Sequence, residues 1–391
     1  MGFLKCQYWK DQPEAKILFD IIYRRQPYSQ FTSLNIDVLV KLTKFHGLIP
    51  FIFYKLKESN NDIIFNNIYL DFKNPYYWSL IRNLRFWKEF LIIKDAFYQR
   101  NIAMVPLKGM DILVRFYPYF DMRSMCDIDI LIKEDEFQQA ERILSELGYQ
   151  KRLSGLKEEY WRNKQCHIAF FKGPITVELH FNLDFKRKYT RRTLLPYLWQ
   201  RTQVYQVYNV QNQKIRLLSS EDAVFCFALH LRRFGNILSL KQVLDVARII
   251  KETPNFDWDY MLKEAQQNRI NATLYFILMQ VALFTETEIP RFIFQKLKLA
   301  CWQKNLIKKF LLRYTFANKI PLKQIYLRAH FLLYDNLLES IYYLLNIPYE
   351  QFCKFYGLKF YSLQADFLYA IRFLYLPFKQ VIGLLKDHNK N

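Results

Sequence analysis

Residues 126–132 place the strongest restriction on the fold, because aspartate and isoleucine alternate there with a period of two. Successive side chains of an extended strand point to opposite faces, so the isoleucines share one face while Asp127 and Asp129 project side by side from the other. Neighbouring carboxylates repel unless a cation or solvent separates them, and such oxygen ligands suit Mg²⁺ shared with substrate phosphates. The pattern alone also fits a half-exposed edge strand with two solvated acids.

A second alternating stretch, residues 176–184, favours the metal-binding interpretation. Its odd positions are apolar, and its even positions from Glu178 to Asp184 are polar. If this strand lies beside residues 126–132, Glu178 provides a third carboxylate for one or two metal ions. Asp184 is the weaker substitute, and we interpret His180 as a hydrogen-bonding partner of Glu178 rather than a ligand.

Both stretches belong to a mixed segment, residues 102–184, in which short apolar runs alternate with turn signals. Gly148 is placed to end a helix, and Gly173-Pro174 is placed to turn a hairpin. We predict strands at 103–107, 126–133, 169–172 and 176–184, and helices at 109–116 and 135–147.

The flanking regions read as mainly helical. Residues 15–91 have apolar residues at helical spacing, with breaks expected near Pro27, Pro50 and Pro75. After residue 186 a strand pair at 204–207 and 214–218 leads into helices, the first of which is capped by Ser219 or Ser220. We therefore predict an α+β fold, a small mixed sheet with flanking helices in a mostly helical chain. The expected division is a helical region 1–74, a catalytic core 75–185 and a basic helical region 186–391.

The composition agrees with this division. The 391 residues are 51% hydrophobic and 18% aromatic, with only 9 glycines and 13 prolines, which favours packed helices over a turn-rich all-β design. The six cysteines are scattered without a C-x-x-C pair, which argues against a zinc site or a disulfide framework and fits a reducing cytoplasm. No secretory signal is evident and no run of about 18 residues escapes charge, so we expect a cytoplasmic protein with no transmembrane segment.

A formal net charge of +21 would draw polyanions to the surface. The charge is concentrated in residues 186–216, with eight Lys or Arg and no acid, and in residues 304–328, with seven and none. These stretches fit solvated helix faces as well as they fit a polyanion-binding surface.

Candidate phosphate ligands lie upstream of the acids. Lys108 and Gly109 come where a buried strand should pass into a helix, so backbone N–H groups there could face phosphate oxygens, and Lys108 could add a positive charge. Arg123 and Ser124 precede Asp127 by a few residues, and Arg123 could neutralise the acids or contact phosphate. An ordinary turn is the competing interpretation of the Lys-Gly pair.

Taken in order, these residues closely resemble the uncharacterised bacterial nucleotidyltransferase family, over roughly residues 75 to 250. The residues that carry the resemblance are Leu107-Lys108-Gly109, Tyr117-Pro118, Arg123, Asp127-Ile128-Asp129-Ile130-Leu131-Ile132, Leu147-Gly148-Tyr149, His167 and Val177-Glu178-Leu179-His180. In the helical half they are Ser220-Glu221-Asp222, Leu229-His230 and Leu244-Asp245-Val246-Ala247.

The resemblance implies a polymerase-β-like core in which Asp127 and Asp129 bind Mg²⁺ or Mn²⁺ and Glu178 completes the acidic set. It also implies that Lys108-Gly109 takes the place of the superfamily's phosphate-binding glycine motif. Here the usual Gly-Ser or Gly-Gly pair is replaced by Lys-Gly and lies unusually far from the aspartates. The grouping of Arg123 and Ser124 with the aspartates also resembles the abortive-infection type of nucleotidyltransferase toxin.

The remaining histidines are less informative. His230, beside an apolar helix face, is either a supporting site residue or a packed core residue, and Asp245 is equally ambiguous. We interpret His46, His167 and His330 as structural.

The sequence therefore predicts an enzyme that moves a nucleotidyl group from an NTP, such as ATP, to an acceptor and releases pyrophosphate. The acceptor could be RNA, a protein or a small molecule. The alternatives are a non-catalytic protein that binds RNA or another polyanion on the same scaffold, and a toxin-like enzyme that modifies tRNA. Peripheral membrane attachment through the aromatic and basic C-terminal helices is the remaining possibility.

Overall fold

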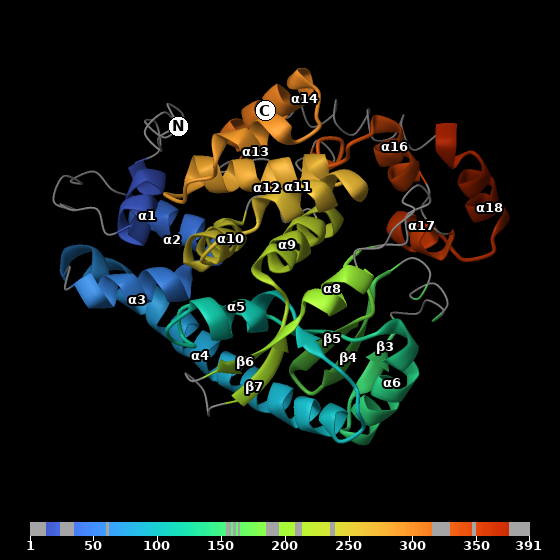
Figure 1. The fold of residues 1–391 in the computed structure, drawn as a ribbon, viewed down its shortest axis with the longest axis horizontal. Helices are drawn as coiled ribbons and strands as arrows, with labels where there is room; N and C mark the ends of the chain where they lie inside the picture. The colour runs from blue at the N-terminus through green and yellow to red at the C-terminus, as the bar shows by residue number, and fades with distance from the viewer. Residues whose placement is uncertain are drawn as a thin grey trace.

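Residues 105–180 form a five-stranded mixed sheet (Figure 1). Its strand order is β1-β2-β5-β4-β3, and β2 and β5 are parallel while the other neighbours are antiparallel. The strands are β1 (Val105–Pro106), β2 (Ile128–Leu131), β3 (Gln150–Arg152), β4 (His167–Lys172) and β5 (Ile175–His180). The computed structural model describes residues 13–23, 35–59, 62–153, 158, 162, 165–184, 195–207, 213–234, 239–314, 329–345 and 349–374.

One face of this sheet is apolar and buried over its three central strands, β2, β5 and β4. Its side chains have no exposed surface, which accounts for the period-two pattern that defines the strands. They are Ile128, Ile130, Ile168, Phe170, Val177 and Leu179. The β4–β5 hairpin turns at Gly173, whose φ of +55° suits glycine, as the sequence predicted. The opposite face is therefore free to carry polar side chains.

Two helices of the core pack around this sheet. Helix α5 (Lys108–Phe116) follows β1, and α6 (Phe137–Glu146), preceded by the 3₁₀ turn η4 (Glu134–Glu136), connects β2 to β3. The chain leaves α6 through Gly148 at φ +87°, which confirms the predicted helix end. Phe137 of α6 meets Phe181 edge-on at 5.5 Å between ring centroids.

The N-terminal region is helical, as predicted. It consists of α1 (Pro13–Tyr23), α2 (Ile36–Phe45), α3 (Ile49–Ser59) and α4 (Asp62–Tyr98). Pro50 lies in the first turn of α3, where its missing N–H costs little, so the break predicted there is confirmed. The break predicted near Pro27 lies outside the described residues.

The break predicted at Pro75 is wrong, because α4 runs without interruption through this residue. An internal proline costs a helix about 3 kcal/mol. The aromatic side chains that α4 buries outweigh this cost, at about 1.5 to 3 kcal/mol each. They are Phe72, Tyr76, Phe86, Trp87, Phe90 and Phe97. The boundary predicted after residue 74 thus falls within α4, which crosses the lower part of Figure 1 beside the sheet.

A two-stranded sheet and a set of helices follow. The predicted strand pair is confirmed as antiparallel β6 and β7, and the Ser219 hydroxyl accepts the Asp222 N–H at 3.1 Å, as expected of the cap of α9. The elements are α8 (Leu195–Arg201), β6 (Gln203–Val207), β7 (Gln213–Leu217), α9 (Ser220–Phe234), α10 (Leu240–Glu252), α11 (Trp258–Gln267), α12 (Asn271–Phe284), α13 (Arg291–Lys296), α14 (Cys301–Tyr314), α16 (Leu337–Leu345), α17 (Tyr349–Tyr356) and α18 (Leu363–Ala370).

One hydrophobic core extends through the described chain from Ala15 to Tyr334, so the five-stranded sheet and most of the helices share a single interior. Helices α17 and α18 pack around a small separate cluster that contains Phe352 and Cys353. Within the described residues, no helix combines the length and apolarity required to cross a membrane. Residues 185–194 and 315–328, which hold much of the two basic stretches, lie outside the described residues, as does the boundary predicted after residue 185.

Candidate active site

The parallel pairing of β2 and β5 places Asp129 directly opposite Glu178. The antiparallel pairing of β4 and β5 places His167 opposite His180. Directly opposed residues in a sheet share a face, so all four side chains lie on the polar face. The prediction that Glu178 lies on a strand beside the aspartates is therefore confirmed.

Asp129 is the most enclosed of the acids, with 4% of its side chain exposed. Its Oδ1 accepts from Lys108 Nζ at 2.6 Å and from His180 Nε2 at 2.9 Å. Burial alone would raise the pKa of Asp129, but Lys108 and His180 outweigh it and hold this pKa well below its usual range. Burial lowers the pKa of Lys108, whereas the charges of Asp129 and Glu178 raise it, with a net increase. Asp129 and Lys108 thus form a buried, charged pair.

Glu178 is more accessible, with 20% of its side chain exposed. Its Oε2 lies 3.4 Å from His180 Nε2 and its Oε1 lies 3.5 Å from His167 Nε2. Ligand atoms of Asp129, Glu178 and His180 all lie within 4.8 Å of one another, a spacing that could accommodate a metal ion. The sequence predicted His180 as a partner of Glu178, but His180 lies closer to Asp129 and contacts both carboxylates.

Asp127 lies one residue before β2 and is half-buried. Burial, followed by the negative charge of Asp129, raises the pKa of Asp127 to about 7. A carboxylate in this position is destabilised by its acidic neighbours, and a bound cation would relieve that repulsion. Asp127 is not one of the three residues whose ligand atoms converge within 4.8 Å.

Lys108 begins α5 with a backbone φ of +45°, an uncommon conformation for a residue with a side chain. Such a conformation costs on the order of 1 to 3 kcal/mol and persists only where the surroundings impose it. The buried contact between its ammonium and Asp129 is one such constraint. The helix that follows has nine residues and no side-chain cap at Leu107. Within the predicted Lys108-Gly109 pair, Lys108 therefore lies against Asp129 of β2.

Arg123 is bound by a buried carboxylate of α10. Its Nε and Nη2 donate to the Asp245 carboxylate at 2.8 to 2.9 Å, and the Tyr117 hydroxyl donates to the same carboxylate at 2.9 Å. All three residues are buried. The geometry therefore explains Asp245, which the sequence left ambiguous, as the anchor of the loop that leads into β2.

Ser124 lies in that same loop and is half-buried. Its carbonyl oxygen accepts from Lys241 Nζ of α10 at 3.2 Å. Burial, followed by the charge of Arg123, lowers the pKa of Lys241. The sequence did not predict a role for Lys241, because nothing near an isolated lysine at the start of a helix indicates that its side chain contacts a distant loop.

Gly109 provides space for the Arg123 side chain. A Cβ at position 109 would lie 3.0 Å from Arg123 Nη1 and 3.1 Å from Met125 Cγ. We predict that Gly109→Ala destabilises the protein by about 1 to 3 kcal/mol, despite the better helix propensity of alanine, because Asp245 prevents Arg123 from moving aside. Urea unfolding would measure the change. Unchanged or increased stability would contradict the expectation.

His230 lies on α9 and is within electrostatic range of the acid cluster. Burial, followed by the positive charge of Lys108, lowers its pKa well below the usual range. Asp184, the predicted substitute for Glu178, forms an ion pair with Arg232 of α9. His46 Nδ1 accepts the Leu240 N–H at 3.3 Å and His330 Nε2 lies 3.2 Å from the Ser340 carbonyl oxygen, in line with the structural roles expected of them.

Comparison with known proteins decides the family. The model of the uncharacterised nucleotidyltransferase family matches residues 32–286, which is more than half of the 391-residue chain. The chain belongs to this family. As a nucleotidyltransferase it carries the activity class that the sequence predicted, and its α+β core agrees with the predicted fold class.

Two other comparisons add little detail about this nucleotidyltransferase. The curated proteins contain no significant match to it. Among solved structures, the solution structure of the antibiotic-resistance factor ANT(2'')-Ia aligns at a TM-score of 0.31 and 13% identity, covering 44% of this chain and 82% of that one. This structural similarity is too low to indicate a substrate.

Proposed function

We propose that this nucleotidyltransferase moves a nucleotidyl group from an NTP to a hydroxyl of its acceptor, with release of pyrophosphate, at a site made of Asp127, Asp129 and Glu178. The supporting observation is the register of β2 and β5, which places Asp129 and Glu178 opposite each other on one polar face. Family membership supplies the reaction class. The roles of the individual residues are our assignment.

The donor set fits a divalent cation of the Mg²⁺ or Mn²⁺ kind. Asp127, Asp129 and Glu178 offer carboxylate oxygens, the ligands that these ions prefer. Both contacts of Asp129 use Oδ1, so Oδ2 is the atom we assign to a cation. Bound there, the cation would neutralise phosphate charge and lower the pKa of a coordinated hydroxyl.

The chain's own residues would position and neutralise the triphosphate. Lys108 begins α5, whose first backbone N–H groups have no intrahelical partners and can face phosphate oxygens. Its ammonium already lies against Asp129, so a triphosphate bound beside the acids would also be within its reach. Glu178, the more exposed carboxylate, is our candidate for accepting the proton of the attacking hydroxyl.

Arg123, Ser124 and Asp245 would act indirectly. Because Arg123 is bound to Asp245, we assign it to fixing the loop before Asp127 rather than to contacting phosphate. Ser124 stays a candidate nucleotide contact at the end of that loop. His180 would orient Asp129 and Glu178, and His230 of α9 would support the cluster electrostatically.

Replacing Lys108 with methionine tests its assigned role. Methionine has a side chain of similar length and would adopt the same backbone conformation at position 108, so the main change is the loss of the positive charge. We expect kcat/KM for the NTP to fall on the order of 100-fold, as for the loss of one charge-stabilising donor. Lys172→Met, at an exposed lysine that contacts Glu89, is the matched control. If Lys108→Met has the same kcat/KM as the wild-type protein, Lys108 does not act in the nucleotide site.

The acceptor is tested directly by labelling. The purified protein would be incubated with each α-labelled NTP, with Mg²⁺ or Mn²⁺, and with total RNA or cell extract, and the labelled species would be identified. The net charge of +21 favours a polyanionic acceptor such as RNA, and label in tRNA would support the toxin-like activity. Label in protein or in a small molecule would identify those acceptors instead. Tight RNA binding without any transfer would support the non-catalytic alternative.

We also assign the enzyme to the cytoplasm. The cysteines at 126, 166, 226, 301 and 353 are not in disulfide bonds, which is the usual state in a reducing compartment. Liposome sedimentation would test attachment to membranes through the C-terminal helices, for which the described residues offer no additional support.

A further inference from the structure

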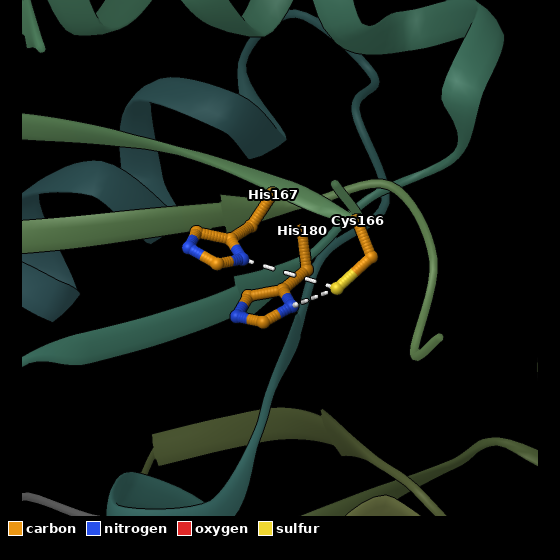
Figure 2. A group of neighbouring side chains, drawn as sticks. All are labelled: Cys166, His167 and His180. Atoms are coloured by element: carbon orange, nitrogen blue, oxygen red, sulfur yellow. Dashed lines mark hydrogen bonds between the residues drawn. The ribbon is translucent and has the colours of Figure 1, made fainter. Parts of the chain in front are cut away.

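A thiol and two imidazoles converge at the end of the polar face where β4 begins and β5 ends. Cys166 Sγ lies 3.8 Å from His167 Nδ1 and 3.9 Å from His180 Nδ1. Figure 2 shows the two rings side by side with one nitrogen of each directed at the sulfur. The ring centroids are 4.8 Å apart, and all three side chains are buried.

The other nitrogen of each ring faces a carboxylate. His180 Nε2 lies 2.9 Å from Asp129 Oδ1, and His167 Nε2 lies 3.5 Å from Glu178 Oε1. Histidines that bind a metal through one nitrogen nearly always direct the other N–H to a carboxylate, a carbonyl or water, which fixes the tautomer. Both rings here have that arrangement, and it leaves Nδ1 as the ligand atom on the cysteine side.

We infer that Cys166, His167 and His180 bind a zinc-class transition metal ion through Sγ, Nδ1 and Nδ1. One thiolate and two imidazoles are a soft to borderline ligand set, which suits Zn²⁺ and is poorly suited to Mg²⁺. The candidate ligand atoms lie within 4.8 Å of one another. This ion would be separate from the cation assigned to the three carboxylates, which face the opposite nitrogen of His180.

The sulfur–nitrogen distances need little adjustment. With zinc bonds of about 2.3 Å to sulfur and 2.0 to 2.1 Å to nitrogen in a tetrahedron, sulfur and nitrogen lie about 3.6 Å apart. The measured separations of 3.8 and 3.9 Å exceed this by a few tenths of an ångström, within the reach of small side-chain rotations. The cluster provides three ligands among the described residues, so water or a substrate group would complete the tetrahedron.

The site has a structural consequence for the acids. Zinc on Nδ1 of both rings would keep each Nε2 protonated and directed at Asp129 and Glu178. The metal would thus fix the orientation of the carboxylates, although it binds the opposite nitrogen of each ring. The sequence does not predict this site, because Cys166 and His167 are adjacent and lack the usual spacing of metal ligands. His180 lies beside them only because β4 pairs with β5.

The metal content of the full-length protein tests the inference without any assay of activity. Protein expressed with added zinc and purified without chelator should retain about one zinc per chain by mass spectrometry. Cys166→Ala should lose at least nine tenths of it, whereas Cys353→Ala, at a buried cysteine in the separate α17–α18 cluster, should retain it. No zinc in the wild-type protein, or equal zinc in Cys166→Ala, would overturn the inference.

A second measurement needs no variant. Chelator-treated wild-type protein titrated with Co²⁺ should develop a thiolate-to-cobalt charge-transfer band, and excess Mg²⁺ should not suppress it because Mg²⁺ disfavours sulfur and nitrogen ligands. Absence of the band would show that the thiol and imidazoles only hydrogen-bond to one another. Co²⁺ binding without this band, and displaced by Mg²⁺, would assign the binding to the carboxylates instead.

Discussion

Asp129→Asn is expected to reduce nucleotidyl transfer by at least about 1,000-fold, because it removes a charge that binds cation and organises the site. The same substitution should also destabilise the protein. Lys108 and His180 both contact Asp129 Oδ1, and a buried ammonium that loses its counter-charge costs about 3 to 5 kcal/mol. Transfer would be measured with α-labelled NTP, and stability by urea unfolding.

A double variant separates these two effects. Lys108→Met combined with Asp129→Asn removes both members of the buried pair, so much of the lost stability should return while transfer stays at the level of Asp129→Asn. Asp135→Asn, at an exposed acid in η4, is the control and should leave both properties unchanged. Substantial transfer by a folded double variant would remove Asp129 from the catalytic assignment.

Asp245→Ala is expected to destabilise the protein by about 3 to 5 kcal/mol, because it leaves the Arg123 guanidinium buried without a counter-charge. Asp245 accepts from Arg123 and from Tyr117, and no part of its side chain is exposed. The midpoint of urea unfolding would report the change. Asp259→Ala, at an exposed aspartate in the first turn of α11, should cost no more than about 1 kcal/mol.

The pair variant Arg123→Met with Asp245→Leu removes both charges and should recover part of the stability. If Asp245→Ala unfolds at the wild-type urea concentration, Asp245 does not anchor the loop before β2. In that case Arg123 would again be a candidate for contacting phosphate.

The sequence predicted the central sheet well because its signals are local. Alternation placed Asp129 and Glu178 on polar faces of separate strands, and Gly148 and Gly173 marked a helix end and a hairpin. That these two strands lie side by side was then a reasonable hypothesis, since both have one apolar face to bury, but their parallel direction was not predicted. Edge strand β3 was missed, because residues 150–152 are largely exposed and have no apolar pattern.

What the sequence could not predict depends on contacts between distant segments. Pro75 predicted a helix break, but the buried aromatic face of α4 holds the helix together. The sequence predicted that Arg123 could contact phosphate, but its guanidinium is bound by Asp245, which lies 122 residues further along the chain. His167 was interpreted as structural, although strand pairing places it between a thiol and Glu178. In each case a partner far along the chain decides the role.

The central claim is that Asp127, Asp129 and Glu178 bind a catalytic divalent cation together with an NTP. Titration of Mn²⁺ followed by electron paramagnetic resonance, with a non-hydrolysable NTP analogue present, tests it most directly. We predict that the wild-type protein and Asp135→Asn deplete the signal of free Mn²⁺ equally, while Glu178→Gln and the Lys108→Met, Asp129→Asn double variant deplete it far less. Equal Mn²⁺ binding by all four proteins would contradict the claim.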